Sequence, residues 1–134
     1  MNKESVLQLL LCHLGEFRYH SGLLSELLEL LANTGIEKYF FKQFIKRLSI
    51  LARFGINAVV HEEFENIGQG IYSMHLSAKG YNIRVLYGFL PNSMPVLLLA
   101  FYERSGKRKT DYSLHLSPAK NRLQEEGERF NNEH

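Results

Sequence analysis

The sequence predicts a single α+β domain, because a helical period of apolar residues gives way after residue 55 to short extended runs and then to a final helix. A chain of 134 residues suits one hydrophobic core. Hydrophobic residues make up 45% and charged residues 22%, which is typical of globular proteins and excludes a disordered or repetitive chain. We expect N-terminal helices packed on a twisted antiparallel sheet of about four strands, followed by a C-terminal helix.

Two helices are expected before residue 55. Residues 23–31 are rich in leucine, and the turn-forming run 33–35 would end that helix. Over residues 36–54 apolar side chains recur at spacings of three and four, and Gly55 would end the second helix. Residues 5–19 fit either a helix or, towards their end, an edge strand.

Extended runs separated by turn residues follow Gly55 and indicate a sheet. The expected strands are 58–64, 70–76, 81–90 and 95–103. Short connections at 77–80 and 91–93 predict antiparallel hairpins, and the continuously apolar run 96–100 predicts a strand buried on both faces. Ser117 and Pro118 have the residue types that start a helix, so a final helix is expected from there through Leu123.

Cysteine content and hydropathy restrict the compartment. Cys12 is the single cysteine, so neither an intramolecular disulfide nor a cysteine-based zinc site can form. No apolar run reaches the roughly 18 residues that span a bilayer, and the N-terminus does not resemble a secretory signal. These features favour the cytoplasm and no membrane association. The run 61–63 (His-Glu-Glu) lacks the spacing of a helical zinc motif, so no metal site is expected.

Charge is unevenly distributed, although the net charge is only +2. Residues 1–103 are balanced, residues 104–122 carry six basic residues against Asp111, and residues 123–134 are acidic. The basic residues of the middle segment are Arg104, Lys107, Arg108, Lys109, Lys120 and Arg122. A phosphate backbone is the common complement of such a segment, while a solvated loop is the alternative.

Short motifs along this order of elements resemble the RelE/ParE toxin superfamily, and most closely its phage-derived, HigB-like branch. The motifs are IYSMH at 71–75, YNIRVLY at 81–87, LLLAF at 97–101, GKRKTDY at 106–112 and AKNRL at 119–123. The resemblance covers roughly residues 23–124. It implies one toxin domain over residues 1–134, with 1–22 as a possible N-terminal extension.

The resemblance implies a toxin of a type II toxin-antitoxin pair, neutralised by a cognate antitoxin that often carries a helix-turn-helix domain. Many members cleave messenger RNA on the ribosome, by attack of a ribose 2′-hydroxyl on the adjacent phosphate, without a metal or cofactor. Two alternatives stay open: a ParE-like toxin that acts on DNA gyrase without cleaving RNA, and an inactive phage-derived binding protein that keeps only the scaffold.

Two arginines are the expected phosphate-binding groups. Alternation in the strand places Arg84 on the face opposite Ile83 and Val85, and the resemblance makes that face the phosphate-binding one. A guanidinium stays charged and holds a phosphate through two parallel hydrogen bonds. By the same resemblance, Arg108 is expected to contact the scissile phosphate, with Lys107 as the second choice.

The resemblance also suggests proton-transfer and RNA-binding residues. Tyr112 or His115 is expected to transfer protons, because imidazole titrates near neutrality and a tyrosine pKa falls beside cations. The residues expected to bind RNA are Arg104, Lys107, Lys109 and Lys120. The sequence departs from the family at Ser73, His75 and Glu103: relatives often have glutamate at the first of these positions and cationic residues at the other two. His75 is a candidate titratable group, whereas Glu103 reduces the positive field.

Overall fold

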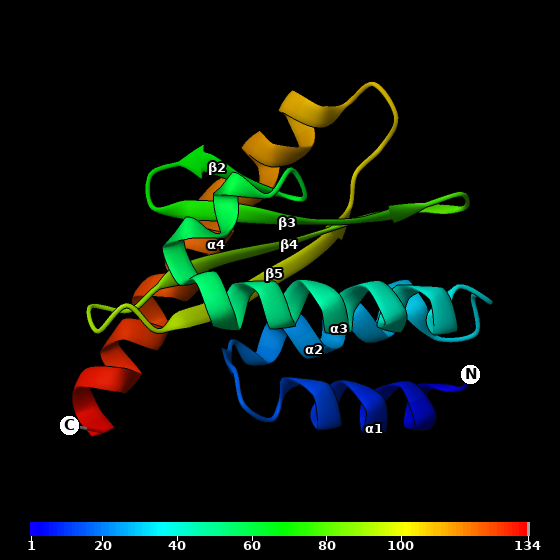
Figure 1. Cartoon of the computed structure of the whole chain (residues 1–134), viewed down its shortest axis with the longest axis horizontal. Helices are drawn as coiled ribbons and strands as arrows, with labels where there is room; N and C mark the ends of the chain where they lie inside the picture. Colours follow the sequence, from blue (N-terminus) through cyan, green and yellow to red (C-terminus); the bar gives the residue numbers. More distant parts are fainter. Residues whose placement is uncertain (134) are drawn as a thin grey trace.

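The computed structural model describes residues 1–133 and confirms the α+β class. The helical elements of the first half are α1 (Lys3–Leu14), α2 (Ser21–Leu31), α3 (Glu37–Phe54) and the 3-10 helix η1 (Gly55–Val60). The strands are β1 (Arg18–Tyr19), β2 (Phe64–Gly68), β3 (Ile71–Ala78), β4 (Tyr81–Phe89) and β5 (Pro95–Tyr102). The chain then enters the long helix α4 (Arg108–Glu133) (Figure 1).

The strands form one five-stranded sheet in the order β1-β5-β4-β3-β2. Strands β2 to β5 are joined in sequence as antiparallel neighbours, as the short connections predicted. The two-residue β1 adds a parallel pairing to β5, so the ambiguous N-terminal segment contains both a helix and an edge strand. The apolar run 96–100 is buried inside β5, which lies between β4 and β1.

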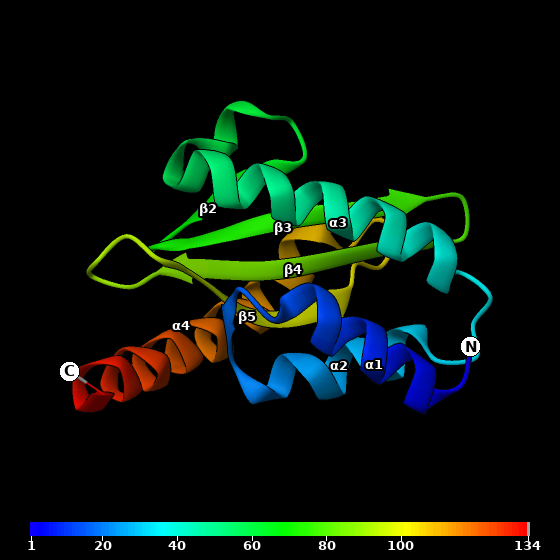
Figure 2. The same cartoon turned by 60° about the horizontal axis from the view of Figure 1, so that its bottom comes forward.

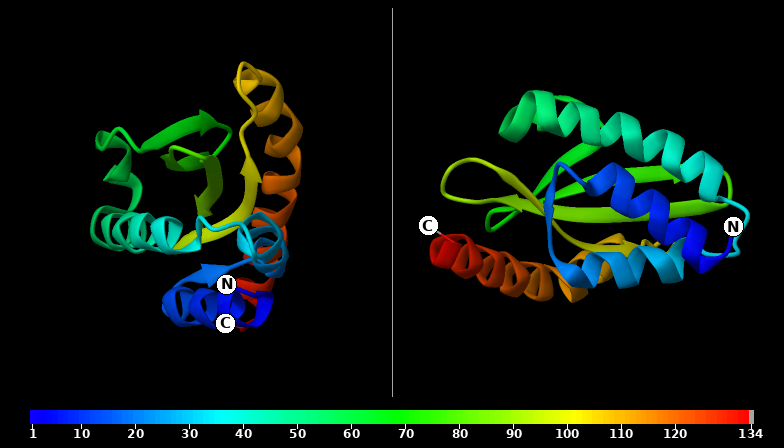
Figure 3. Two further views of the ribbon diagram at one scale, coloured as in Figure 1. Left: turned by 90° about the vertical axis from the view of Figure 1, so that its right-hand side faces the viewer. Right: turned by 90° about the horizontal axis from the view of Figure 1, so that it is seen from below.

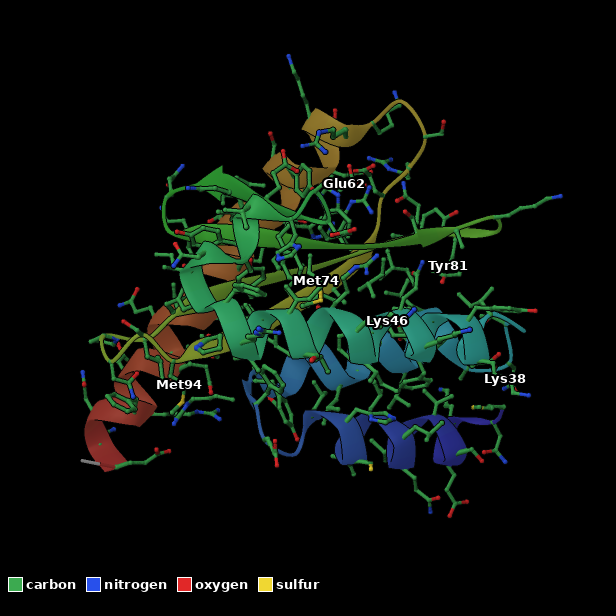
Figure 4. All side chains as sticks on the ribbon, in the orientation of Figure 1. Lys38, Lys46, Glu62, Met74, Tyr81 and Met94 are labelled. Atoms are coloured by element: carbon green, nitrogen blue, oxygen red, sulfur yellow. The ribbon has the colours of Figure 1, made fainter. Side chains whose placement is uncertain are left out.

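The two faces of the sheet carry two hydrophobic cores. Helices α1, α2 and α3 cover one face, and α4 covers the other (Figure 2 and Figure 3). Met74 extends from β3 toward α3, within the first core (Figure 4). The first core also contains Val6, Leu10, Leu27, Phe40, Phe44, Val85 and Tyr87. The second contains Ile71, Leu86, Leu98, Phe101 and Ala119, with Leu116 and Leu123 packed against it.

The expected strand at 58–64 is wrong. Residues 55–60 form η1, and the strand begins only at Phe64. Within η1 only Ala58 is buried, while Val59 and Val60 are exposed. One buried residue among six suits a helical segment that touches the core on one side. A half-buried strand would instead bury every second residue.

The expected start of the last helix at Ser117 and Pro118 is also wrong, because α4 begins at Arg108 and contains Pro118 in its interior. A proline there leaves one helical hydrogen bond unmade. The carbonyl that loses its partner belongs to Leu114, whose residue is 59% exposed, so water can satisfy it. Packing of Leu116 and Ala119 on the sheet supports the helix through this break.

Within residues 1–133, none of the helices combines the length and the apolar character that crossing a membrane requires.

Replacing glycine by alanine should have opposite effects on stability at two positions. Gly55 ends α3 with φ +54° and ψ −127°, a conformation that side chains other than glycine rarely adopt. We expect Gly55→Ala to lower the free energy of unfolding by about 1–3 kcal/mol. Gly127 lies inside α4 with open space around it, so Gly127→Ala should raise that free energy by about 0.5–1 kcal/mol. Urea denaturation of both variants measures the two effects, and equal responses would contradict this interpretation of Gly55.

Candidate functional site

Seven polar side chains gather on the α4 face of the sheet, and we call them the polar cluster. They come from β2, β3, β4, the residue that follows β5 and the first turns of α4. The members are Glu65, Ser73, His75, Arg84, Glu103, Arg108 and Tyr112. Sheet register brings its centre together, since His75 of β3 lies directly opposite Arg84 of β4.

Arg84 forms the buried base of the polar cluster. Alternation along β4 turns it to the α4 face, as predicted, where only 7% of the residue is exposed. Its Nη2 donates to Oε2 of Glu103 at 3.2 Å, and Nδ2 of Asn82 donates to the same oxygen at 3.1 Å. Nε of Arg84 and Oε1 of Glu103 are buried without a hydrogen-bond partner. Arg84 is therefore neutralised by a carboxylate, but both groups keep unused hydrogen-bonding capacity.

Arg108 lies above this pair at the start of α4, with its side chain 46% exposed. Its Nη2 donates to Oε2 of Glu65, and its Nη1 lies 4.0 Å from Oε1 of Glu103. The guanidinium also lies 4.9 Å from the ring centre of Tyr112. Arg108 is thus the accessible cation of the polar cluster, held between two carboxylates.

Tyr112, Ser73 and His75 form a chain of proton-carrying groups. The Tyr112 hydroxyl lies 2.9 Å from Oγ of Ser73 and 3.3 Å from Nε2 of His75. The same Nε2 lies 3.2 Å from Oε1 of Glu65. An ionised carboxylate only accepts hydrogen bonds, so Nε2 must donate to Glu65, which leaves Ser73 as the partner of the Tyr112 hydroxyl.

Burial sets the protonation states of the Tyr112 and His75 rings. It raises the pKa of Tyr112, so the phenol keeps its proton near neutral pH. Burial, together with the charge of Arg84, lowers the pKa of His75, and the opposing attraction of Glu65 is smaller. At neutral pH the site therefore holds a neutral imidazole beside a protonated phenol.

A cavity of about 390 Å³ opens beside the polar cluster, between β2 and the first three turns of α4. Its walls are Glu65, Ile67, Arg108, Lys109, Tyr112, Ser113 and Leu116. Arg108 and Tyr112 thus face a space where a ligand can bind, with Lys109 at its rim.

Some residues expected at the site lie outside the polar cluster. His115 stacks on Phe101 with ring centres 4.1 Å apart, and burial lowers its pKa. Arg104 donates from Nη2 to Asp111 at 2.6 Å. Lys120 donates to Gln69, which lies in the β2–β3 turn.

Lys107 is exposed in the loop before α4. Of the eight residues expected to act, the structure brings together Arg84, Arg108, Tyr112 and, at the cavity rim, Lys109.

Pairing with carboxylates reduces the positive field that the sequence suggested. Arg84 pairs with Glu103, Arg104 with Asp111, and Arg108 with Glu65. Two of these carboxylates lie before residue 104, outside the basic segment, so counting charges along the chain could not reveal the neutralisation.

Glu65 is the member of the polar cluster that the sequence did not reveal. It lies in a strand that began later than expected, and it pairs with a residue 43 positions further along. Ser73, His75 and Glu103 are the three positions at which the sequence departs from the pattern it resembles. Each of them is a direct neighbour of Tyr112 or Arg84. In the described part of the chain, no group of three or more histidine, cysteine or acidic side chains is placed to hold a metal ion.

No protein-family model, curated protein or solved structure matches this chain.

The buried pair of Arg84 and Glu103 should respond asymmetrically to substitution. Arg84→Ala should lower the free energy of unfolding by about 3 kcal/mol, because it leaves the carboxylate of Glu103 buried without its main cation. The double variant Arg84→Met/Glu103→Leu should recover most of that loss. Urea denaturation of both variants tests this, and a single variant as stable as wild type would contradict it.

His75 should titrate below the ordinary histidine value of about 6.5. Glu65→Gln should lower the pKa of His75 further, because it removes a negative charge that stabilises the imidazolium. Glu62→Gln should leave that pKa unchanged. The folded state binds this proton less tightly than the unfolded chain. The contribution of His75 to stability is therefore complete above about pH 6.5 and is lost as the pH falls below it. NMR titration of labelled histidines measures these values, and a raised pKa in Glu65→Gln would contradict the assignment.

Proposed function

We propose that this protein is a metal-independent RNA endonuclease, the toxin of a type II toxin-antitoxin pair that cleaves messenger RNA on the ribosome. The observation that carries the proposal is the open cavity lined by Arg108 and Tyr112, with Nε2 of His75 only 3.3 Å from the Tyr112 hydroxyl and Arg84 buried opposite His75 in the sheet. The resemblance of the motifs to RelE/ParE toxins supplies the biological setting. That setting includes a helix-turn-helix antitoxin as partner and the cytoplasm as location.

Cleavage through a ribose 2′-hydroxyl needs an acceptor for its proton, a cation for the phosphate charge and a donor for the leaving 5′ oxygen. Arg108 is accessible and can hold a phosphate through two parallel hydrogen bonds. The neutral His75 suits the acceptor role once its Nε2 is released from Glu65, because the imidazole can then carry its single proton on Nδ1 and leave Nε2 free to accept one. Tyr112 keeps its proton and suits the donor role. Arg84, 7% exposed beneath them, is paired with Glu103 and holds that carboxylate below Arg108.

A second candidate is a binding protein that keeps the scaffold without cleaving RNA. The pairing of Arg84 and Arg108 with Glu103 and Glu65 favours it, because both phosphate-binding groups already have anionic partners. A toxin that acts on DNA gyrase falls in the same non-nuclease class.

Tyr112→Phe should remove RNA cleavage while keeping the fold, because it deletes one hydroxyl and leaves the ring packed on Phe101. We expect a loss of about 10²-fold or more in cleavage rate. Tyr39→Phe is the matched control, since Tyr39 is 70% exposed on α3, across the sheet. Both variants and wild type are expressed under an inducible promoter, and growth is followed together with the 5′ ends of cellular messages.

Growth arrest with new message ends in wild type and Tyr39→Phe, both lost in Tyr112→Phe, is the expected result. Arrest with intact messages would overturn the nuclease proposal in favour of gyrase or another target. Normal growth with every variant would favour the binding protein.

A further inference from the structure

Glu65 forms hydrogen bonds with two of the three groups that the proposed reaction needs. Its Oε2 accepts from Arg108, and its Oε1 accepts from Nε2 of His75. The carboxylate comes from the edge strand β2, whereas its two partners lie on α4 and β3. In the free protein, the phosphate-binding cation and the proton acceptor are therefore held by one internal anion.

A phosphate that enters the cavity must compete with Glu65 for Arg108. The side chain of Glu65 is 33% exposed and lines the cavity, so it can move away from Arg108 into solvent. An ion pair as accessible as this one lowers the affinity of a competing ligand by a factor of about 5. Displacement has a second effect, because it also frees Nε2 of His75.

Arg108 need not leave the site when Glu65 does. Its Nη1 lies 4.0 Å from Oε1 of Glu103, a buried oxygen without a hydrogen-bond partner. Glu103 is fixed from below by Arg84 and Asn82. It can therefore keep the guanidinium over the cavity while a phosphate takes the place of Glu65.

We propose that Glu65 is a specificity-determining residue: it makes isolated single-stranded RNA a poor ligand and restricts the site to RNA that a further surface holds in place. This inference rests on the proposed function, since it names the RNA that the same site accepts. RNA fixed against a larger assembly has already lost much of its freedom, so its phosphate competes with Glu65 more effectively than a free strand does.

Binding of a free RNA strand tests the role of Glu65 without requiring cleavage. The probe is a fluorescent 12-nucleotide single strand of mixed sequence with every 2′-hydroxyl methylated, titrated with the full chain at fixed salt. Glu65→Gln should bind it about 5-fold more tightly than wild type. Glu62→Gln is the matched control, because it removes the same charge from an exposed position three residues away, and it should change affinity less than 2-fold.

A second variant shows whether the gain acts through Arg108. In Glu65→Gln/Arg108→Gln the gain should disappear, although the net charge equals that of wild type. Glu65→Ser provides a smaller side chain and should reproduce the gain, and circular dichroism shows that each variant is folded. Equal affinity of Glu65→Gln and wild type, an equal gain in Glu62→Gln, or a gain that survives loss of Arg108 would overturn the proposal.

The ends of cellular messages in the expression experiment distinguish this inference from the proposed function. A gain of about 5-fold in binding together with intact messages in wild type would overturn the nuclease and keep the role of Glu65. New message ends in wild type with no gain in binding by Glu65→Gln would do the reverse.

Discussion

The packing of α4 across the second face of the sheet is the constraint on which the candidate site depends. The helix packs on the second core through Leu116, Ala119 and Leu123. Gly88 of β4 allows this close approach, because a Cβ there would lie 2.9 Å from the side chain of Leu123. The first turns of α4 then project over β3 and β4 and carry Arg108 and Tyr112 to strand residues far away in sequence.

Charge at the site is organised in two layers. The lower layer is the buried pair of Arg84 and Glu103, where removal of either partner leaves an uncompensated charge. The upper layer is the accessible contact of Arg108 with Glu65, where replacing the carboxylate by another anion costs little free energy. This division lets the base of the site stay fixed while its upper part responds to a ligand, and it locates the electrostatic specificity of the site in Glu65.

The sequence predicted the sheet well and the candidate site in part. Strong periodicity made α3 and the hairpins of β3 to β5 visible, and alternation alone assigned Arg84 to its face. The errors at η1 and at the start of α4 share a cause. Local residue types favoured a strand at 58–64 and a helix start at Pro118, and packing against the cores overrode both preferences.

What the sequence by itself determined was the α+β class, the order of most elements and the set of basic and aromatic residues available to a site. Only the tertiary structure decided which of them meet. It placed His115 against Phe101 and drew Arg104 to Asp111. It also brought Glu65 and His75 to Arg108 and Tyr112. The physical reason is that the contacts of Glu65 with Arg108 and of His75 with Tyr112 join residues 43 and 37 positions apart, through sheet register and the docking of α4, and no local pattern records either.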